Sequence, residues 1–432
     1  MRRLLGAEFD AFVASFDRPR TRALRLNPAK TSAAELADLL DVALTPVPWC
    51  PTGFELPPDV RLGLHPARLA GLFYLQEPSS MSPAETLAPG PGATVADLAA
   101  SPGGKTTALA ELVGPDGVVV ANDVLGSRLR PLHDNLDLWG AANVVTLSRS
   151  IERLAEDDVR VDAVLLDAPC SAEALFRRDR AAVRQWSVGA VAGSARRQRG
   201  LLDAARRLVR QGGALVYSTC TFEAEENEAR IDELLAADPD WRLESTVRLW
   251  PHRVAGEGQF VARLVNVQTP DEARRTNYRG FGRSGEAARA WEHFARATMP
   301  GFTAPDERIV TREDRVFLAP PTPAPVPGHL LARPGLPLGR LRPGRFEPHP
   351  ALACAVPPDV VMSRVNWPLD APELAAYLRG ETVAHPGPDG WVLVCYERWG
   401  LGWARRHDGM LKNHLPQHLR SRTPPALSQP AR

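Results

Sequence analysis

A regular alternation of strand-like and helix-like segments between residues 85 and 266 constrains the fold more than any other feature. Amphipathic patterns predict helices at Lys105–Val113, Gly126–Trp139, Val191–Arg210 and Ala224–Ala236. Short apolar runs predict strands at Thr94–Leu98, Val118–Ala121, Val144–Leu147, Ala163–Asp167, Ala214–Ser218 and Phe260–Val265. Strands separated by helices pack as a parallel sheet covered on both faces. We therefore predict an α/β chain with a doubly wound, Rossmann-like sheet and an antiparallel strand at its late end.

Two cysteines, Cys170 and Cys220, each follow one of these predicted strands. Side chains just past the carboxyl ends of parallel strands meet in the crevice where open α/β sheets bind ligands. Taken alone, each thiol is more often buried packing than a reactive group, and a disulfide between them is a further alternative. Together with Asp167, three residues before Cys170, the pair indicates methyl transfer to a pyrimidine carbon. Five cysteines in 432 residues, with no signal peptide, give no disulfide framework, and their spacing suits no metal.

The segment Ala99–Thr107 follows the first strand and opens a helix, as a cofactor loop does. Its two glycines let the backbone approach a ligand, and a helix N-terminus favours negative groups. A nucleoside-triphosphate loop needs glycine where Ala99 stands. Asp123, after the next strand, occupies the position that binds ribose hydroxyls in such folds. A nucleoside cofactor without pyrophosphate is therefore favoured, and S-adenosyl-L-methionine fits. The expected contacts are Ala99, Ala100, Ser101, Pro102, Gly103, Gly104, Lys105, Asp123, Arg128, Ser150 and Asp167.

These motifs resemble those of the RNA cytosine-C5 methyltransferases of the Sun/Nop type, most closely the branch that modifies bacterial 16S rRNA (the RsmF type). The chain departs from the family pattern at Ala172 and Ala174, where the family has glycine, and at Ser150, where it commonly has aspartate. The matching segments are Gln76–Met81, Ala99–Thr107, Asp167–Ser171, Ser218–Phe222, Glu225–Glu228, Leu249–Arg253, Gly256–Gly258, Arg345–Pro348, Leu401–Trp403 and Lys412–His414.

The resemblance implies a class I methyltransferase fold and a covalent mechanism that yields 5-methylcytosine. Cys220, as thiolate, would attack C6 of the cytosine, while Asp167 holds or protonates N3. Cys170 would assist release of the product. Lys105 would serve the pocket, the alternative being a structural lysine at a helix start. The target base must be flipped or already single-stranded, because a stacked base cannot react.

Composition divides the chain into four regions. We expect an α+β RNA-binding region at 1–75, the methyltransferase core at 76–268, a linker region at 269–328 and a mostly β domain at 329–432. The linker includes the proline-rich run Pro320–Pro327, typical of a stiff connector. The last domain resembles PUA-like RNA-binding modules, with Arg405, Arg406, Lys412 and Arg420 as expected phosphate contacts. Ten arginines between Arg177 and Arg210 form either a second phosphate footprint or a solvated helix face.

The remaining expectations concern partners and competing classes. A net charge of +1 argues against a nonspecific nucleic-acid coat protein. No apolar run approaches membrane-spanning length, so we expect a cytoplasmic monomer that binds ribosomal RNA or the small ribosomal subunit, without membrane or metal. A DNA cytosine methyltransferase remains an alternative, although Thr219-Cys220 argues against it. A catalytically silent rRNA-binding assembly factor is another, although the intact thiol pair argues against that.

Overall fold

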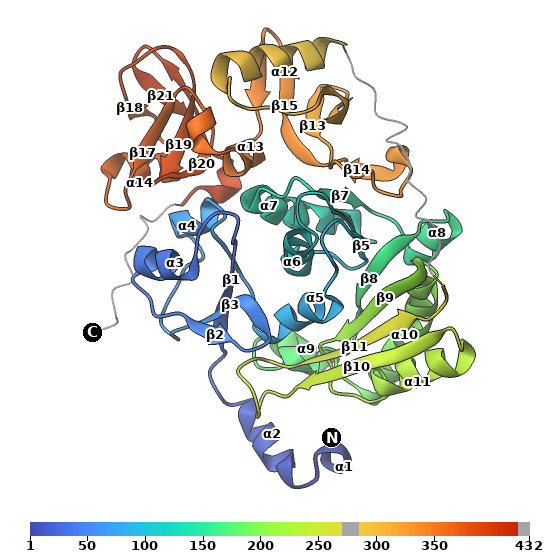
Figure 1. Ribbon diagram of the computed structural model, residues 1–432. Coiled ribbons are helices and arrows are strands. Elements are labelled where there is room, and N and C mark those ends of the chain that lie inside the picture. The colour runs from blue at the N-terminus through green and yellow to red at the C-terminus, as the bar shows by residue number, and fades with distance from the viewer. Residues whose placement is uncertain (270–284, 422–432) are drawn as a thin grey trace.

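An eight-stranded sheet forms the centre of the protein, for which the computed structural model describes residues 1–269 and 285–421. The strand order is β10-β11-β9-β8-β5-β6-β7-β14 (Figure 1). Strands β5 to β9 run parallel, whereas β11, β10 and β14 are antiparallel to their neighbours. The bounds are β5 Thr94–Asp97, β6 Val118–Asn122, β7 Val144–Leu147, β8 Val161–Asp167, β9 Val209–Thr219, β10 Trp241–Leu249, β11 Gln259–Asn266 and β14 Leu331–Arg333. The predicted doubly wound sheet with a late antiparallel strand is confirmed.

Helices cover both faces of this sheet, which explains why its central strands are apolar throughout. In β6, Val118 and Val120 face one apolar cluster, whereas Val119 and Ala121 face the other. One cluster includes residues of α5 Ser82–Leu87, α6 Gly104–Leu112 and α7 Leu129–Trp139. The other includes residues of α8 Ile151–Glu156, α10 Val188–Arg206 and α11 Glu228–Ala237. The four predicted helices are present, α7 being preceded by a 3-10 turn at Gly126–Arg128. The sequence analysis missed β10, an edge strand whose middle residues are exposed.

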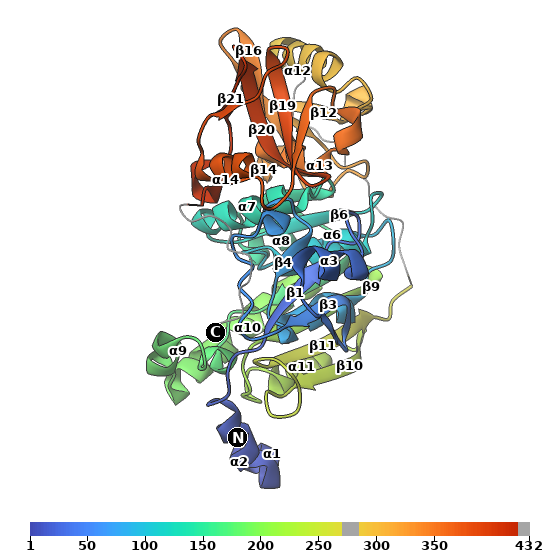
Figure 2. The same cartoon turned by 90° about the vertical axis from the view of Figure 1, so that its left-hand side faces the viewer.

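The N-terminal region begins with two short helices, α1 Arg2–Leu5 and α2 Phe9–Ser15, at the lower end of the molecule in Figures 1 and 2. Phe12 of α2 is buried there against Phe222 and Trp250 of the core. A four-stranded sheet of order β2-β3-β1-β4 follows. Its elements are β1 Arg22–Leu26, α3 Ala33–Leu40, β2 Thr45–Val47, β3 Cys50–Leu56, α4 Pro66–Leu69 and β4 Phe73–Leu75. Ser32 caps α3 by accepting a hydrogen bond from the backbone of Glu35, as the sequence pattern indicates.

The segment predicted as a linker contains regular structure, so that prediction is wrong for its described part. It holds α12 Gly285–Thr298, β12 Ile309–Arg312 and β13 Arg315–Leu318, and the two strands join a sheet with β15 Leu336–Arg342 and β16 Arg345–Pro348. The proline-rich run is anchored to the core. Ala324 and Val326 are buried in the apolar cluster of the central sheet, because their side chains find an apolar surface there. Residues 270–284 of the predicted linker lie outside the described part of the chain.

The last region is mostly β, as expected. After α13 Pro350–Ala355, its sheet has the order β17-β19-β20-β21-β18. The bounds are β17 Arg364–Trp367, α14 Pro372–Arg379, β18 Val383–Ala384, β19 Gly390–Tyr396, β20 Trp399–His407 and β21 Met410–Asn413. Residues of this sheet, such as Trp367, share one apolar cluster with residues of the N-terminal sheet, such as Leu24 and Phe73. The N-terminal and C-terminal sheets are therefore packed together (Figure 1). Within the described residues, no helix is both long and apolar enough to cross a bilayer.

Candidate active site

The two thiols meet because their strands are neighbours in register. Strands β8 and β9 pair in parallel, with Asp167 opposite Ser218, so Cys170 and Cys220 leave the same edge of the sheet. Their sulfur atoms lie 3.4 Å apart, and both cysteines are free. The hydrogen bond to Cys220, together with burial, raises the pKa of the Cys170 thiol well above its usual range. Cys170 therefore holds its proton beside Cys220.

The Asp167 carboxylate is held from both sides. Its Oδ2 accepts a hydrogen bond from Lys105 Nζ at 2.7 Å. Its Oδ1 accepts hydrogen bonds from Ser218 Oγ at 2.7 Å and from Gln259 Nε2 at 3.1 Å. Burial is the largest single influence on Lys105 and acts to lower its pKa, but the charge and hydrogen bond of Asp167, together with Asp97 and Cys220, outweigh it and the pKa is raised. A fixed ammonium group therefore stays within electrostatic range of Cys220. Ser218 and Gln259 were not among the predicted site residues.

A cavity of about 300 Å³ lies over the carboxyl ends of these strands. Cys220 lines the cavity, whereas Cys170, Gly103, Asp123, Arg128 and Ser150 are not among its lining residues. The predicted residues that line it are Ala99, Ala100, Ser101, Pro102, Gly104, Lys105, Asp167 and Cys220. Of the two thiols, only that of Cys220 is thus presented to a ligand in this cavity.

The cofactor loop has a fixed conformation. Gly103 adopts a φ of 111°, in the left-handed region that favours glycine. Arg128 donates a hydrogen bond to the Ser101 carbonyl at 2.9 Å and lies 3.6 Å from Asp123 Oδ2. That Oδ2 atom is buried and has no hydrogen-bond partner among the described residues. Buried acceptors are normally paired, so Asp123 offers a place for a ligand donor such as a hydroxyl group.

One predicted position, Ser150, and one that was not predicted, Asp97, have mainly local contacts. Ser150 is the N-cap of α8 and accepts a hydrogen bond from the backbone of Arg153 at 3.4 Å. Asp97 ends β5 beneath the cofactor loop, where its Oδ2 accepts a hydrogen bond from Thr106 Oγ1 at 2.7 Å. Burial raises the pKa of Asp97 to about 6. Asp97 is a structural carboxyl group that the sequence analysis did not single out.

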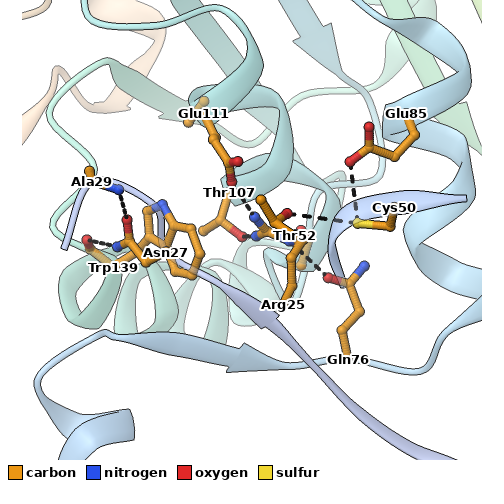
Figure 3. A network of polar contacts seen from close by, with 12 residues as sticks. Arg25, Asn27, Ala29, Cys50, Thr52, Gln76, Glu85, Thr107, Glu111 and Trp139 are labelled. Carbon is orange, nitrogen blue, oxygen red and sulfur yellow. Dashed lines mark hydrogen bonds and ion pairs between the residues drawn. The ribbon is translucent and has the colours of Figure 1, made fainter. Parts of the chain in front are cut away.

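Arg25 of β1 ties the N-terminal sheet to the cofactor loop (Figure 3). Its guanidinium group is completely buried and donates to Gln76 Oε1, to Glu111 Oε2 at 2.8 Å and to the Gly104 carbonyl at 3.3 Å. It also donates to Thr107 Oγ1. Gly104 precedes Lys105, so the arginine supports the start of α6. Burial raises the pKa of Glu111 to about 7 despite the nearby guanidinium. In the sequence, Arg25 stands between Leu24 and Leu26 in a strand-like segment. That pattern was the available signal for a buried charge, but Arg25 was not predicted as a site residue.

The loop that carries Cys170 is held by a buried carboxylate. Glu226 accepts hydrogen bonds from the backbone and hydroxyl of Ser171 and from Gln198 Nε2. Glu173 accepts from Ser171 and from Trp186 Nε1. Ala172, between them, has a φ of 63°, a left-handed conformation that is unfavourable for a residue with a Cβ. The glycine of the family pattern would be unstrained at this position.

The predicted phosphate contacts of the last domain differ in exposure. Arg406 is buried and hydrogen-bonds to Ser363, His385 and the Pro388 carbonyl, so its prediction as a phosphate contact is wrong. The sequence showed its charge but not its inward orientation on β20. Lys412 and Arg420 are exposed and Arg405 is half-buried.

Four models of known protein families match this chain, and together they cover most of it. The model described as 16S rRNA methyltransferase RsmB/F matches residues 84–265. Models of the N-terminal domain, the first C-terminal domain and the PUA domain of the RsmF methyltransferase match residues 1–78, 293–356 and 364–421. The match at 293–356 spans the boundary we predicted between linker and final domain.

Relatives match along nearly the whole chain. A ribosomal RNA small subunit methyltransferase F of Erwinia tasmaniensis is 32% identical, over 95% of this chain and 93% of the relative. One of Escherichia coli O81 is 33% identical, over 95% and 92%. A solved methyltransferase homolog of Pyrococcus horikoshii is 33% identical with a TM-score of 0.54, covering 60% of this chain and 91% of that one. NSun6 of Pyrococcus horikoshii with SFG has a TM-score of 0.56 at 23% identity, covering 62% and 97%, and shows the fold alone.

Proposed function

The chain belongs to the RsmB/F family of 16S rRNA methyltransferases, and on this premise we propose that it methylates C5 of a cytosine in 16S rRNA through a covalent Cys220–C6 adduct. The observation that carries the proposal is the thiol pair at the ends of β8 and β9. Cys220 lines the cavity beside Asp167 and Lys105, whereas Cys170 stands 3.4 Å from Cys220 with a raised pKa.

The residues present suit S-adenosyl-L-methionine as the cofactor. Asp123 Oδ2, which accepts no hydrogen bond among the described residues, is a buried acceptor of the kind that ribose hydroxyl groups satisfy. Arg128 links Asp123 to Ser101, which bounds the cavity together with Ala99, Ala100, Pro102 and Gly104. When bound, the cofactor supplies an electrophilic methyl group.

The nucleophile is assigned to Cys220 on electrostatic grounds. A thiolate, not a thiol, attacks carbon, and a nearby cation favours the thiolate. Lys105 supplies that cation and interacts electrostatically with Cys220. The hydrogen bond to Cys220, and then burial, raise the pKa of Cys170, which disfavours Cys170 as the attacking thiolate.

The other residues then control protons and orientation. Attack by Cys220 at C6 places negative charge on N3. Asp167, fixed by Lys105, Ser218 and Gln259, is positioned to pass a proton to N3 and then to accept the N3–H hydrogen bond. C5 is now electron-rich and gains the methyl group. C5 then loses its proton to a water molecule, the C6–sulfur bond breaks, Cys220 leaves as thiolate and N3 returns its proton to Asp167. We assign assistance in this release to Cys170, because it adjoins the sulfur that departs.

Incubation with tritiated cofactor and either 16S rRNA or DNA tests the proposal, with nucleoside analysis of the product. We expect label in RNA as 5-methylcytosine. Label in DNA would instead support the DNA cytosine methyltransferase. No label in naked rRNA or in small subunits would support the silent assembly factor and refute the proposed function.

A further inference from the structure

A second, larger groove adjoins the catalytic cavity and shares part of its lining. Its volume is about 1260 Å³, against about 300 Å³ for the cavity. One wall comes from the N-terminal sheet and the segment before α4, and the opposite wall from the start of α14. The two lie side by side because the N-terminal and C-terminal sheets share one apolar cluster (Figures 1 and 2). Five residues line both spaces, namely Leu75, Gln76, Glu77, Arg178 and Glu257.

Three arginines are grouped on the N-terminal wall of the groove. Arg20, Arg22 and Arg61 line the groove, and none of them forms an ion pair within the described residues. Burial, and then repulsion from Arg61 and Arg20, lowers the pKa of Arg22, so the three guanidinium groups lie within electrostatic range of one another. Such a cluster is stabilised by an anionic ligand.

Four arginines and four acidic residues line the groove, but among the described residues no carboxylate lies within ion-pair distance of Arg20, Arg22 or Arg61. Glu77 accepts hydrogen bonds from the backbone of Ser79, Ser80 and Glu257. Glu257 is buried and has Arg178 at 3.7 Å. Asp59 and Asp370 also line the groove.

The groove also offers apolar surface. Leu56, Leu62 and Leu75 line it, and Leu64 on its rim is 56% exposed. Arginines beside the exposed Leu64 suit a strand whose phosphates are charged and whose bases have apolar faces.

We propose that this groove holds the single-stranded RNA that flanks the target cytosine, with Arg20, Arg22 and Arg61 on its phosphates. The proposal rests on the proposed function, because a base in the catalytic cavity remains linked to its neighbours. Those neighbours must leave the cavity, and the groove lies next to it with five lining residues in common. The target base must also be unpaired to react, so a single strand fits this path better than a duplex.

The test compares RNA affinities by fluorescence anisotropy, with a labelled single-stranded RNA of about ten nucleotides that carries one central cytosine. The groove variant is Arg20→Ala with Arg22→Ala and Arg61→Ala. Each phosphate contact contributes roughly 0.7 to the slope of log affinity against log salt. Loss of three contacts should flatten this slope by about 2. Between roughly 50 and 200 mM salt, wild-type affinity should thus fall about 18-fold more than that of the variant.

A matched control removes the same charge elsewhere. Arg242→Ala, Arg289→Ala and Arg296→Ala replace exposed arginines on β10 and α12, and the wild-type slope should persist. A triple Arg→Lys variant of the groove should keep most of the slope, because it keeps the charge. An unchanged slope in the groove variant, or an equal loss in the control, would overturn the proposal. Thermal unfolding and cofactor titration show whether each variant is folded. If the alanine variant is not folded, the slope of the Arg→Lys variant is compared with that of wild type instead, and a lost slope there would overturn the proposal.

The outcome is separable from that of the proposed function. Anisotropy measures binding without turnover, whereas the tritium assay measures methyl transfer by the unaltered protein. If wild type methylates RNA but the groove variant keeps the wild-type salt dependence of RNA affinity, the groove proposal is wrong and the proposed function stands. If wild type transfers no methyl group but the groove variant has a weaker salt dependence of RNA affinity than wild type, the proposed function is wrong and the groove still binds RNA.

Discussion

Replacing Arg25 by methionine should uncouple the N-terminal sheet from the cofactor loop. The Arg25 side chain is 1% exposed, and its partner Glu111 is 22% exposed. Removing one member of a buried ion pair costs about 3–5 kcal/mol, because the other charge stays buried without compensation. For a unit of the size of this core, each kcal/mol corresponds to roughly 2–4 °C in Tm. We therefore expect Arg25→Met to lower Tm by roughly 6–20 °C.

The loss should also depend on pH. The pKa of Glu111 is about 7 in the folded protein, above its ordinary value of 4.5. Folding therefore favours the protonated carboxyl, and the stability that this contributes is present below pH 4.5 and lost as the pH rises through 7. Without Arg25, the ionised carboxylate at pH 8 has lost its main countercharge. The Tm difference between Arg25→Met and wild type should thus be larger at pH 8 than at pH 5.

Scanning fluorimetry at both pH values, with a double variant, measures this coupling. Adding Glu111→Gln to Arg25→Met removes the uncompensated charge, so at pH 8 the double variant should regain much of the lost Tm. Arg242→Met, on the exposed part of β10, is the control and should stay close to wild type. A drop of less than about 2 °C for Arg25→Met, or a double variant no better than the single one, would refute the reasoning.

Three shorter predictions concern the cofactor loop and the Cys170 loop. Asp123→Asn should weaken cofactor binding by roughly 1.5–3 kcal/mol, or about 10- to 150-fold by calorimetry, and an unchanged affinity would exclude Asp123 as the ribose ligand. Asp97 has a folded pKa of about 6, above its ordinary 3.8, so it contributes stability below pH 3.8 that is lost as the pH rises through 6. Asp97→Asn should abolish that loss, up to about 3 kcal/mol, and parallel Tm–pH curves would contradict this. Ala172→Gly should raise stability by roughly 0.5–1 kcal/mol, because the left-handed backbone is unstrained in glycine; a clear loss in urea unfolding would count against strain at Ala172.

The sequence predicted those parts of the site that depend on where strands end. Apolar runs located β8 and β9, and parallel pairing then brings Cys170 and Cys220 to one edge. Arg25 and Gln259 could not be found in this way. Arg25 reaches Gly104 from 79 residues away, and Gln259 reaches Asp167 from 92 residues away. Both contacts depend on how separate segments pack, which local patterns do not specify.

Burial also explains two of the errors. The charge of Arg406 suggested a surface contact, but β20 places it inward with three partners. The proline-rich run suggested a free connector, but Ala324 and Val326 reach the apolar cluster of the central sheet. Composition gives the polarity of a segment, whereas its neighbours decide whether it packs.

The central claim is that Cys220 forms the adduct and Cys170 helps to release it. Denaturing gel electrophoresis of Cys170→Ala and Cys220→Ala after incubation with RNA and cofactor tests it most directly, with mass spectrometry to locate the crosslinked peptide. We predict that Cys170→Ala accumulates a covalent protein–RNA complex through Cys220, whereas Cys220→Ala binds RNA but forms no complex and gives no turnover. A complex that accumulates in Cys220→Ala and is absent in Cys170→Ala would reverse the two roles. Full activity in both variants would contradict the covalent mechanism.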